Sequence, residues 1–198
     1  MSPKINNKLK SKDLIVAGAF AALYVILLFV IVGVMGFMVV TYLAAPFVMG
    51  IVLGPVYMLY VTKVPKRGAI MILAVLVALV TSIGAAWMAT GIWAIFLGLA
   101  AELIAGSGKY RSRKLLASSY AVFACSNMGP FWLLVFAKQA FLDACLTYYN
   151  PEYASQIDAM TPPGFIVVLI ILAFAGGIIG GVLGSKLLKK HFVKAGVV

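Results

Sequence analysis

The chain has 198 residues, of which 64% are hydrophobic and only 11% are charged, and its mean hydropathy is +1.11. A soluble domain has about a quarter of its residues charged, because it needs a solvated surface. The composition therefore excludes a soluble protein and predicts a chain that crosses a membrane several times. The formal net charge of +11 does not indicate a nucleic-acid partner, because the basic residues flank apolar segments and form no stripe of their own.

The apolar segments give the predicted elements. A helix needs about 20 apolar residues to cross the hydrocarbon core of a bilayer. The segments that meet this requirement are 14–33, 39–62, 68–86, 88–106, 115–137 and 164–187. We therefore expect an all-α membrane protein with six transmembrane helices, in a single domain over residues 1–198. The first segment is longer than the apolar part of a signal peptide and no small-residue cleavage motif follows it, so we expect a retained helix.

Basic residues predict the orientation of these helices. All but one of the 16 Lys and Arg residues lie in four short clusters, at 4–12, 63–67, 109–114 and 186–194. Positive charge is retained on the cytoplasmic side of a bacterial plasma membrane. Both termini are therefore expected in the cytoplasm. The outer connections are then 33–38, 84–91 and 138–163.

The third outer connection, 138–163, is much the longest. It contains Asp143, Glu152 and Asp158, three of the five acids of the chain. Long connections in compact proteins are often functional, so we expect a structured outer loop with a role in function. A solvated hairpin that only links two helices is the alternative.

Two prolines interrupt the second segment. Pro46 and Pro55 lack the backbone N–H that a helix uses and predict a kinked or broken helix. Such breaks are tolerated in a membrane only where neighbouring helices or a cavity satisfy the freed carbonyls.

Small residues line faces of the first and sixth segments. On the first segment these residues are Ala17, Gly18, Ala21 and Ala22, and on the sixth they are Gly176, Gly180 and Gly184, offset by Gly177, Gly181 and Ser185. Flat faces allow close approach of another helix in lipid. For the sixth segment we expect packing within the molecule. For the first segment, such packing and docking onto a partner subunit are both open.

Few polar residues lie within the segments, so each one suggests a site. Asn127 is near the middle of the fifth segment, where Gly129 and Pro130 loosen the helix, which favours an Asn127 side chain that points into a cavity over one bonded to a neighbouring helix. The other candidates lie toward the outer side of the membrane. Tryptophan at that depth is more simply explained by the belt of aromatic residues at the membrane–water interface. The predicted ligand-binding residues are Trp87, Thr90, Trp93, Asn127, Trp132, Lys138, Gln139 and Asp143. Lys138 is expected to pair with Asp143 or with an anionic group of a ligand.

The sequence offers little for catalysis. His191 is the only histidine, so neither a histidine cluster for a metal nor a Ser-His dyad can form. Glu102 has no acidic companion in a segment and is expected to form a salt bridge with the cations at 109–114. Cys125 and Cys145 are expected to be free thiols. We predict no enzyme, no metal and no cofactor. Because no nucleotide-binding motif is present, energy from ATP would have to come from another subunit.

Six stretches, in order along the chain, resemble a known family. They are KLKSKDLIVAGAFAALY, GPVYMLYVTKVPKRGAI, LGLAAELIAGSGKYRS, SYAVFACSNMGPFW, MTPPGF and GGVLGSKLLKKHFVKAG. The chain resembles the substrate-binding S components of energy-coupling factor (ECF) transporters, and within that group the Trep_Strep family of integral membrane proteins.

The resemblance implies a membrane subunit that captures a small organic nutrient and works with a T subunit and two ATPases. It implies docking through the first helix, at Ala17 and Ala21 with Gly18 and Ala22 beside them. It also implies an outward-opening pocket in segments four to six. A gating loop at Gly36, Phe37 and Met38 would cover that pocket. Nickel and cobalt members of the group bind metal through an N-terminal histidine, which this chain lacks.

Two other functions stay open at this point. One is an autonomous channel or facilitator for small solutes, assembled through the glycine face of the sixth segment, although no ring of pore-lining polar residues is apparent. The other is a small intramembrane enzyme acting on lipid, whose reactive groups would be Glu102, Cys125, Asn127 and the outer acids. These groups are expected at different depths, which disfavours the enzyme.

Overall fold

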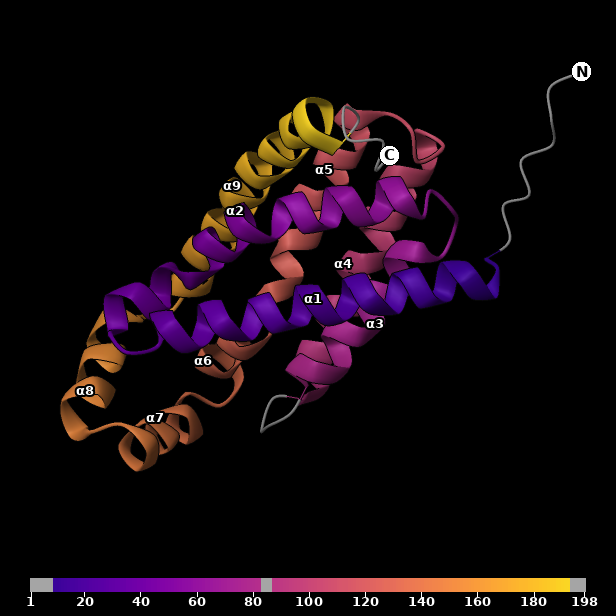
Figure 1. The fold of residues 1–198 in the computed structure, drawn as a ribbon. Helices are drawn as coiled ribbons and strands as arrows, with labels where there is room; N and C mark the ends of the chain where they lie inside the picture. The colour runs from indigo at the N-terminus through magenta and orange to yellow at the C-terminus, as the bar shows by residue number, and fades with distance from the viewer. Residues whose placement is uncertain (1–8, 83–86, 193–198) are drawn as a thin grey trace, which may run out of the picture.

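The computed structural model describes residues 9–82 and 87–192, with the side chains of all of these except 87–89 and 191–192. Every regular element in the described ranges is helical, as the all-α prediction requires (Figure 1). The elements are α1 (Ser11–Met35), α2 (Val39–Lys63), α3 (Ala69–Thr81), α4 (Trp87–Ser107), α5 (Arg113–Ala124), η1 (Cys125–Trp132), α6 (Leu133–Phe136), α7 (Lys138–Tyr148), α8 (Pro151–Met160), α9 (Phe165–Leu187) and η2 (Leu188–Phe192).

Five helical stretches are long and apolar enough to cross a membrane. They are Ser11–Met35, Val39–Lys63, Thr90–Ser107, Arg113–Phe136 and Phe165–Lys190. The third predicted segment, 68–86, is shorter than expected, because α3 has only 13 residues. A helix of that length rises about 20 Å, less than the roughly 30 Å of the hydrocarbon core. Residues 83–86 of that segment lie outside the described residues, and so do 84–86 of the predicted connection 84–91, whose residues 87–91 belong to α4.

The two ends of the bundle differ. The predicted long outer loop is structured, because α7 and α8 fill it and lie together at one end (Figure 1). The beginning of α1 and the end of α9 lie at the other end. The basic residues at 63–67, 109–114 and 186–190 adjoin helix ends there, and we call this the basic end.

The second helix is continuous through both prolines, so the predicted break is absent. α2 runs from Val39 to Lys63 with Pro46 and Pro55 inside it. Neighbouring helices support its backbone: the Tyr120 hydroxyl donates a hydrogen bond of 2.8 Å to the carbonyl of Gly50. The same region of α2 is buried against α9, and tertiary packing of this kind holds a helix together where local propensity would end it.

Glycines bring α2 and α9 into contact through their backbones. A Cβ added to Gly180 would lie 2.1 Å from the carbonyl oxygen of Gly50, and one added to Gly54 would lie 2.4 Å from that of Gly180. Gly176 and Gly184 approach α2 with similar closeness. The expectation that the glycine face of the sixth segment packs within the molecule is confirmed.

The offset glycines of α9 are also occupied. A Cβ at Gly177 would lie 2.9 Å from the Cα of Ala121 on α5, and one at Gly181 would lie 3.1 Å from the Cα of Ala117. Both glycine faces of α9 are therefore covered by α2 and α5. The channel hypothesis loses the oligomer interface on which it depended.

On the first helix, the small residues divide into two sets. Ala17 and Ala21 are buried in the protein core, at 0% and 1% exposure. Gly18 and Ala22 are exposed, and no atom lies within 4 Å of a Cβ added to Gly18. In this structure, Ala17 and Ala21 pack within the molecule and are not accessible to a partner subunit.

Glu102 caps a helix and does not form the predicted salt bridge. Its carboxylate is 6% exposed and accepts hydrogen bonds from the Tyr110 hydroxyl and from backbone amides at the start of α3, those of Gly68 (2.8 Å), Ile70 (3.0 Å) and Met71 (3.3 Å). Amides in a first helical turn have no partner within the helix and favour negative charge. The ion pairs among the described residues are Asp13–Lys66 and Asp158–Lys138, so Glu102 stabilises the α3–α4 hairpin without a cationic partner.

Candidate functional site

The fifth apolar segment changes its helix type near its middle. After α5 ends at Ala124, the eight residues of η1 form a 3₁₀-helix that contains Gly129 and Pro130. Runs of 3₁₀-helix longer than three or four residues are uncommon, and inside a longer helix they often mark a functional position. Gly129 is required where η1 meets α4, because an added Cβ would lie 2.2 Å from Cγ2 of Thr90.

Side chains of α4 donate hydrogen bonds to the backbone of η1. The Thr90 hydroxyl donates to the carbonyl of Gly129 at 2.9 Å, and Nε1 of Trp93 donates to the carbonyl of Cys125 at 2.8 Å. These bonds hold the 3₁₀ geometry, which weakens the backbone's own hydrogen bonding. Thr90 and Trp93 lie at the predicted site, and their donors are already bonded to the backbone.

Asn127 is bonded to a neighbouring helix, contrary to the cavity-facing orientation that the sequence favoured. The Tyr24 hydroxyl of α1 donates to Oδ1 of Asn127 at 3.2 Å, and Nδ2 of Asn127 lies 3.0 Å from that hydroxyl oxygen. Both side chains are buried, at 1% and 0% exposure. The sequence analysis missed Tyr24, and only its place on the small-residue helix could have suggested it.

Two buried polar groups of η1 have no partner among the described residues. They are the hydroxyl of Ser126, which is fully buried, and the indole N–H of Trp132. A buried donor or acceptor without a partner costs about 1–3 kcal/mol. Native structures contain few such groups, and each one suggests a function. The sequence analysis named Trp132 but missed Ser126, although Ser126 is the residue next to Asn127.

Two aromatic residues at the end of η1, Phe131 and Trp132, pack against other rings. Trp132 meets Trp93 edge to face with ring centroids 4.9 Å apart, and it stacks on Phe136 at 5.6 Å. On the other side of η1, Phe131 stacks on Tyr42 of α2 at 4.9 Å. Trp132 therefore combines a large aromatic surface with an indole N–H that has no partner among the described residues.

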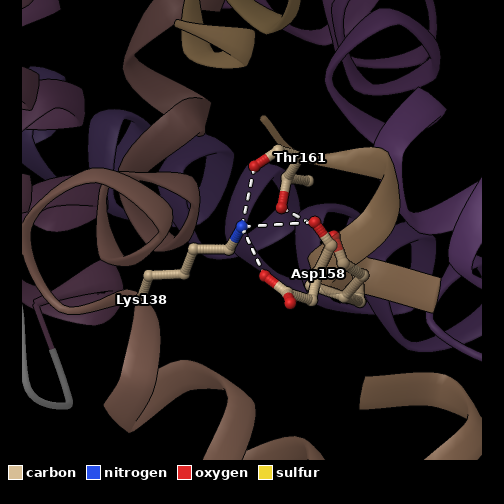
Figure 2. A network of polar contacts seen from close by, with 4 residues as sticks. Lys138, Asp158 and Thr161 are labelled. Carbon is tan, nitrogen blue, oxygen red and sulfur yellow. Dashed lines mark hydrogen bonds and ion pairs between the residues drawn. The ribbon is translucent and has the colours of Figure 1, made fainter. Parts of the chain in front are cut away.

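The cation at the start of α7 is used within the protein. Nζ of Lys138 lies 2.7 Å from Oδ1 of Asp158 and donates to the carbonyls of Asp158 (3.2 Å) and Thr161 (2.9 Å) at the end of α8 (Figure 2). The predicted pairing of Lys138 with Asp143 is wrong. Asp143 instead accepts a hydrogen bond from Gln139 at 3.0 Å, one helical turn away. These three predicted site residues therefore stabilise α7 and its contact with α8.

The predicted gating loop lies against α8 and the connection between α7 and α8. Phe37 and Met38 are exposed and line a hollow of about 240 Å³ together with Asn150, Glu152, Tyr153 and Gln156 of the α8 region. A Cβ at Gly36 would lie 3.2 Å from the hydroxyl of Tyr149, so the loop reaches the α7–α8 connection.

Burial between α7 and α8 raises the pKa of two side chains. Burial raises the pKa of the Tyr153 phenol to about 12, and it raises the pKa of the Cys145 thiol above its ordinary value. Both groups are therefore neutral at physiological pH. Cys145 and Cys125 are free thiols, as predicted, and both are buried.

Around η1, the structure brings together four of the predicted ligand-binding residues: Thr90, Trp93, Asn127 and Trp132. It places Lys138, Gln139 and Asp143 in a separate set on α7. Trp87 is the first residue of α4, and its side chain lies outside the described residues. No group of three or more His, Cys, Asp or Glu side chains that could hold a metal occurs in the described ranges.

Comparison with known proteins gives one match. The family model described as a hypothetical bacterial integral membrane protein (Trep_Strep) matches residues 11–194, which include every helix described above. Neither the curated proteins nor the solved structures that were compared give a match. The family match agrees with the apolar helices of spanning length. The chain is thus a multi-pass membrane protein that belongs to the Trep_Strep family of bacterial integral membrane proteins.

Proposed function

We propose that this protein is the substrate-binding S component of an ECF-type importer. The observation that carries the proposal is the pair of unpartnered polar groups, Ser126 Oγ and Trp132 Nε1, in a membrane-embedded 3₁₀ segment. Polar groups within spans are costly and mark functional positions. Transporters commonly bind their substrates where a spanning helix departs from α geometry.

The substrate is a small organic nutrient, in this proposal. The indole N–H of Trp132 would donate to an acceptor atom of the substrate, and the Ser126 hydroxyl can donate or accept. The faces of Trp93 and Trp132 suit a planar ring. The protein captures this substrate without catalysis or cofactor, and a T subunit with two ATPases supplies the energy for its release inside the cell.

The topology is six crossings with both termini in the cytoplasm. Glu102, near the end of α4, bonds to the first amides of α3, so α3 and α4 form a hairpin whose two ends return to the basic end. The short α3 is then a crossing as well, which brings the five helices of spanning length to six crossings. An odd number of crossings would place one of the basic clusters outside, against the charge rule of bacterial plasma membranes.

Docking to the T subunit uses the exposed face of α1. Because Ala17 and Ala21 are buried, the accessible small residues are Gly18 and Ala22. Ile15 and Ile26, at 74% and 59% exposure, extend this face. Close helix approach at small residues gives dispersion contacts in lipid.

Thermal unfolding of the purified protein against a panel of vitamins, nucleosides and methionine-related metabolites tests the proposal. A ligand present at 100 times its Kd adds about 2.7 kcal/mol of apparent stability, which is readily measured. Ser126→Ala and Trp132→Phe are then expected to weaken binding about fivefold or more, since each removes one hydrogen bond worth about 1 kcal/mol. Ser155→Ala, at an exposed serine on α8, is the matched control.

The outcome separates binding from folding. Ser126 has no protein partner, so Ser126→Ala is expected to leave the stability of the ligand-free protein unchanged or higher. Unchanged ligand affinity in both Ser126→Ala and Trp132→Phe would place the ligand elsewhere and remove the main support for the proposal. Transport by this protein alone in liposomes would contradict the S-component role directly.

A further inference from the structure

A large groove opens on the membrane-facing side of α5 and α9. Its volume is about 700 Å³, and it is lined by apolar side chains that include Val122, Phe174, Ile178 and Val182. The three α9 residues are each more than 40% exposed on a helix of spanning length. The groove therefore faces the hydrocarbon of the bilayer and is independent of the site at η1.

Four cations stand at one end of this groove. Arg113 and Lys114 come from the first turn of α5, and Lys186 and Lys189 from the last turn of α9 and from η2. All four side chains are exposed. None of them forms an ion pair among the described residues, which include all five acids of the chain.

The cations in the first turn of α5 lie at the positive end of the helix dipole, which is unfavourable. Acidic groups are favoured in the first turn of a helix, where the dipole is positive, but the first turn of α5 has Arg113 and Lys114 and no acid. Self-repulsion among four cations and the helix N-terminus is relieved when an external anion binds there. Among the described residues, no carboxylate is paired with any of these four cations.

Along the groove, the side chains change from charged to polar to apolar, in the same order as the parts of a phospholipid. Along one face of α5, Lys114, Ser118 and Val122 follow at intervals of four residues and give a cation, a hydroxyl and an apolar side chain. From Phe174 to Lys189, α9 and η2 rise about 22 Å, close to half of a bilayer about 40–45 Å thick. A groove with this length and this order fits an acyl chain, a glycerol ester region and a phosphate.

We propose that the groove is a binding site for one anionic glycerophospholipid of the leaflet at the basic end. The phosphate binds among Arg113, Lys114, Lys186 and Lys189, and one acyl chain lies along Phe174, Ile178 and Val182. Basic pockets between transmembrane helices bind anionic headgroups in this way. The lipid joins α5 to the end of α9 through its headgroup and stabilises their contact.

Native mass spectrometry and thermal unfolding of the full-length protein in a neutral detergent test this site. The probes are phosphatidylglycerol, phosphatidylcholine with the same acyl chains, and deacylated glycerophosphoglycerol. We expect one retained phosphatidylglycerol and a rise in Tm, with at least tenfold weaker effects from the other two probes. Equal binding of phosphatidylcholine, or an equal effect of the deacylated headgroup, would overturn the proposal.

Paired charge variants locate the site. The groove variant combines Arg113→Gln, Lys114→Gln, Lys186→Gln and Lys189→Gln. The control combines Lys12→Gln, Lys63→Gln, Lys109→Gln and Arg111→Gln, which removes four exposed cations that do not line the groove. The groove variant is expected to lose at least tenfold in affinity for phosphatidylglycerol, and the control less than threefold. Equal losses in both variants would show general attraction to the basic end and reject the site.

Discussion

At the scale of single residues, two neighbours in η1 differ sharply. Asn127 exchanges hydrogen bonds with Tyr24, whereas the hydroxyl of the adjacent Ser126 has no partner among the described residues. Both side chains are buried in the same apolar surroundings. One residue therefore joins α1 to the fifth segment, and the other is the one that we propose to bind a ligand.

Replacement of these two residues is expected to have opposite effects on stability. Asn127→Ala leaves the buried Tyr24 hydroxyl without its partner and should lower the free energy of unfolding by about 1–3 kcal/mol. Ser126→Ala should leave that free energy unchanged or raise it. Thermal unfolding of the ligand-free variants in one detergent measures both. An Asn127→Ala variant as stable as the native protein would show that its bond to Tyr24 contributes nothing.

The sequence identified Asn127 as important but could not identify its partner. Tyr24 lies 103 residues earlier in the chain, and its single hydroxyl gives no local signal. Glu102 is similar, because the amides that it accepts from belong to α3, more than 30 residues away. Polar pairing across a bundle depends on which helices are neighbours, and the apolar pattern of each helix does not contain that information.

At the scale of elements, the sequence predicts the boundaries of a helix where that helix ends at the surface of the bilayer. The sixth segment was predicted at 164–187, and α9 covers Phe165–Leu187. Charges and turn residues fix those ends.

The 3₁₀ segment was only partly predicted: Gly129 and Pro130 indicated a loosened helix, but the bonds from Thr90 and Trp93 that hold its geometry come from α4. The same limit applies to α2, which packing keeps continuous through two prolines.

Two glycines provide a test of helix packing. Gly180→Ala places a methyl group against the backbone of Gly50 and is expected to lower the free energy of unfolding by about 1–3 kcal/mol or to prevent folding. Gly18→Ala has open space around the new methyl group and should raise helix stability by about 0.5–1 kcal/mol. Denaturant titration of both variants checks the difference, and a Gly180→Ala variant at least as stable as Gly18→Ala would refute the observed contact.

At the scale of the whole molecule, the acids of α7 and α8 lie at one end and the basic clusters at the other. With α3 counted as a crossing, the topology that we propose places α7 and α8 on the outer side of the membrane. The proposed orientation rests on the charge rule and on the return of the α3–α4 hairpin to the basic end, and neither α7 nor α8 is long enough to cross the membrane.

Cysteine labelling in intact cells tests this orientation. In a background of Cys125→Ala and Cys145→Ala, Gln156→Cys on α8 should react with a membrane-impermeant maleimide, because Gln156 is exposed at the outer end. Ser107→Cys, exposed at the end of α4, should react only after the membrane is permeabilised. Labelling of Ser107→Cys in intact cells would reverse the proposed topology.

The glycine contact between α2 and α9 has a thermodynamic consequence. Helices that associate through long side chains lose rotamer freedom, at a cost of up to about 2 kcal/mol for each flexible side chain, whereas glycine has no rotamer to lose. The contact between Gly50, Gly54 and Gly180 therefore gains dispersion energy with almost no entropic opposition. In a bilayer, where hydrocarbon removes the hydrophobic driving force between helices, this saving favours a close and rigid contact between α2 and α9. In the proposed importer, α2 and α9 would therefore move together as one unit.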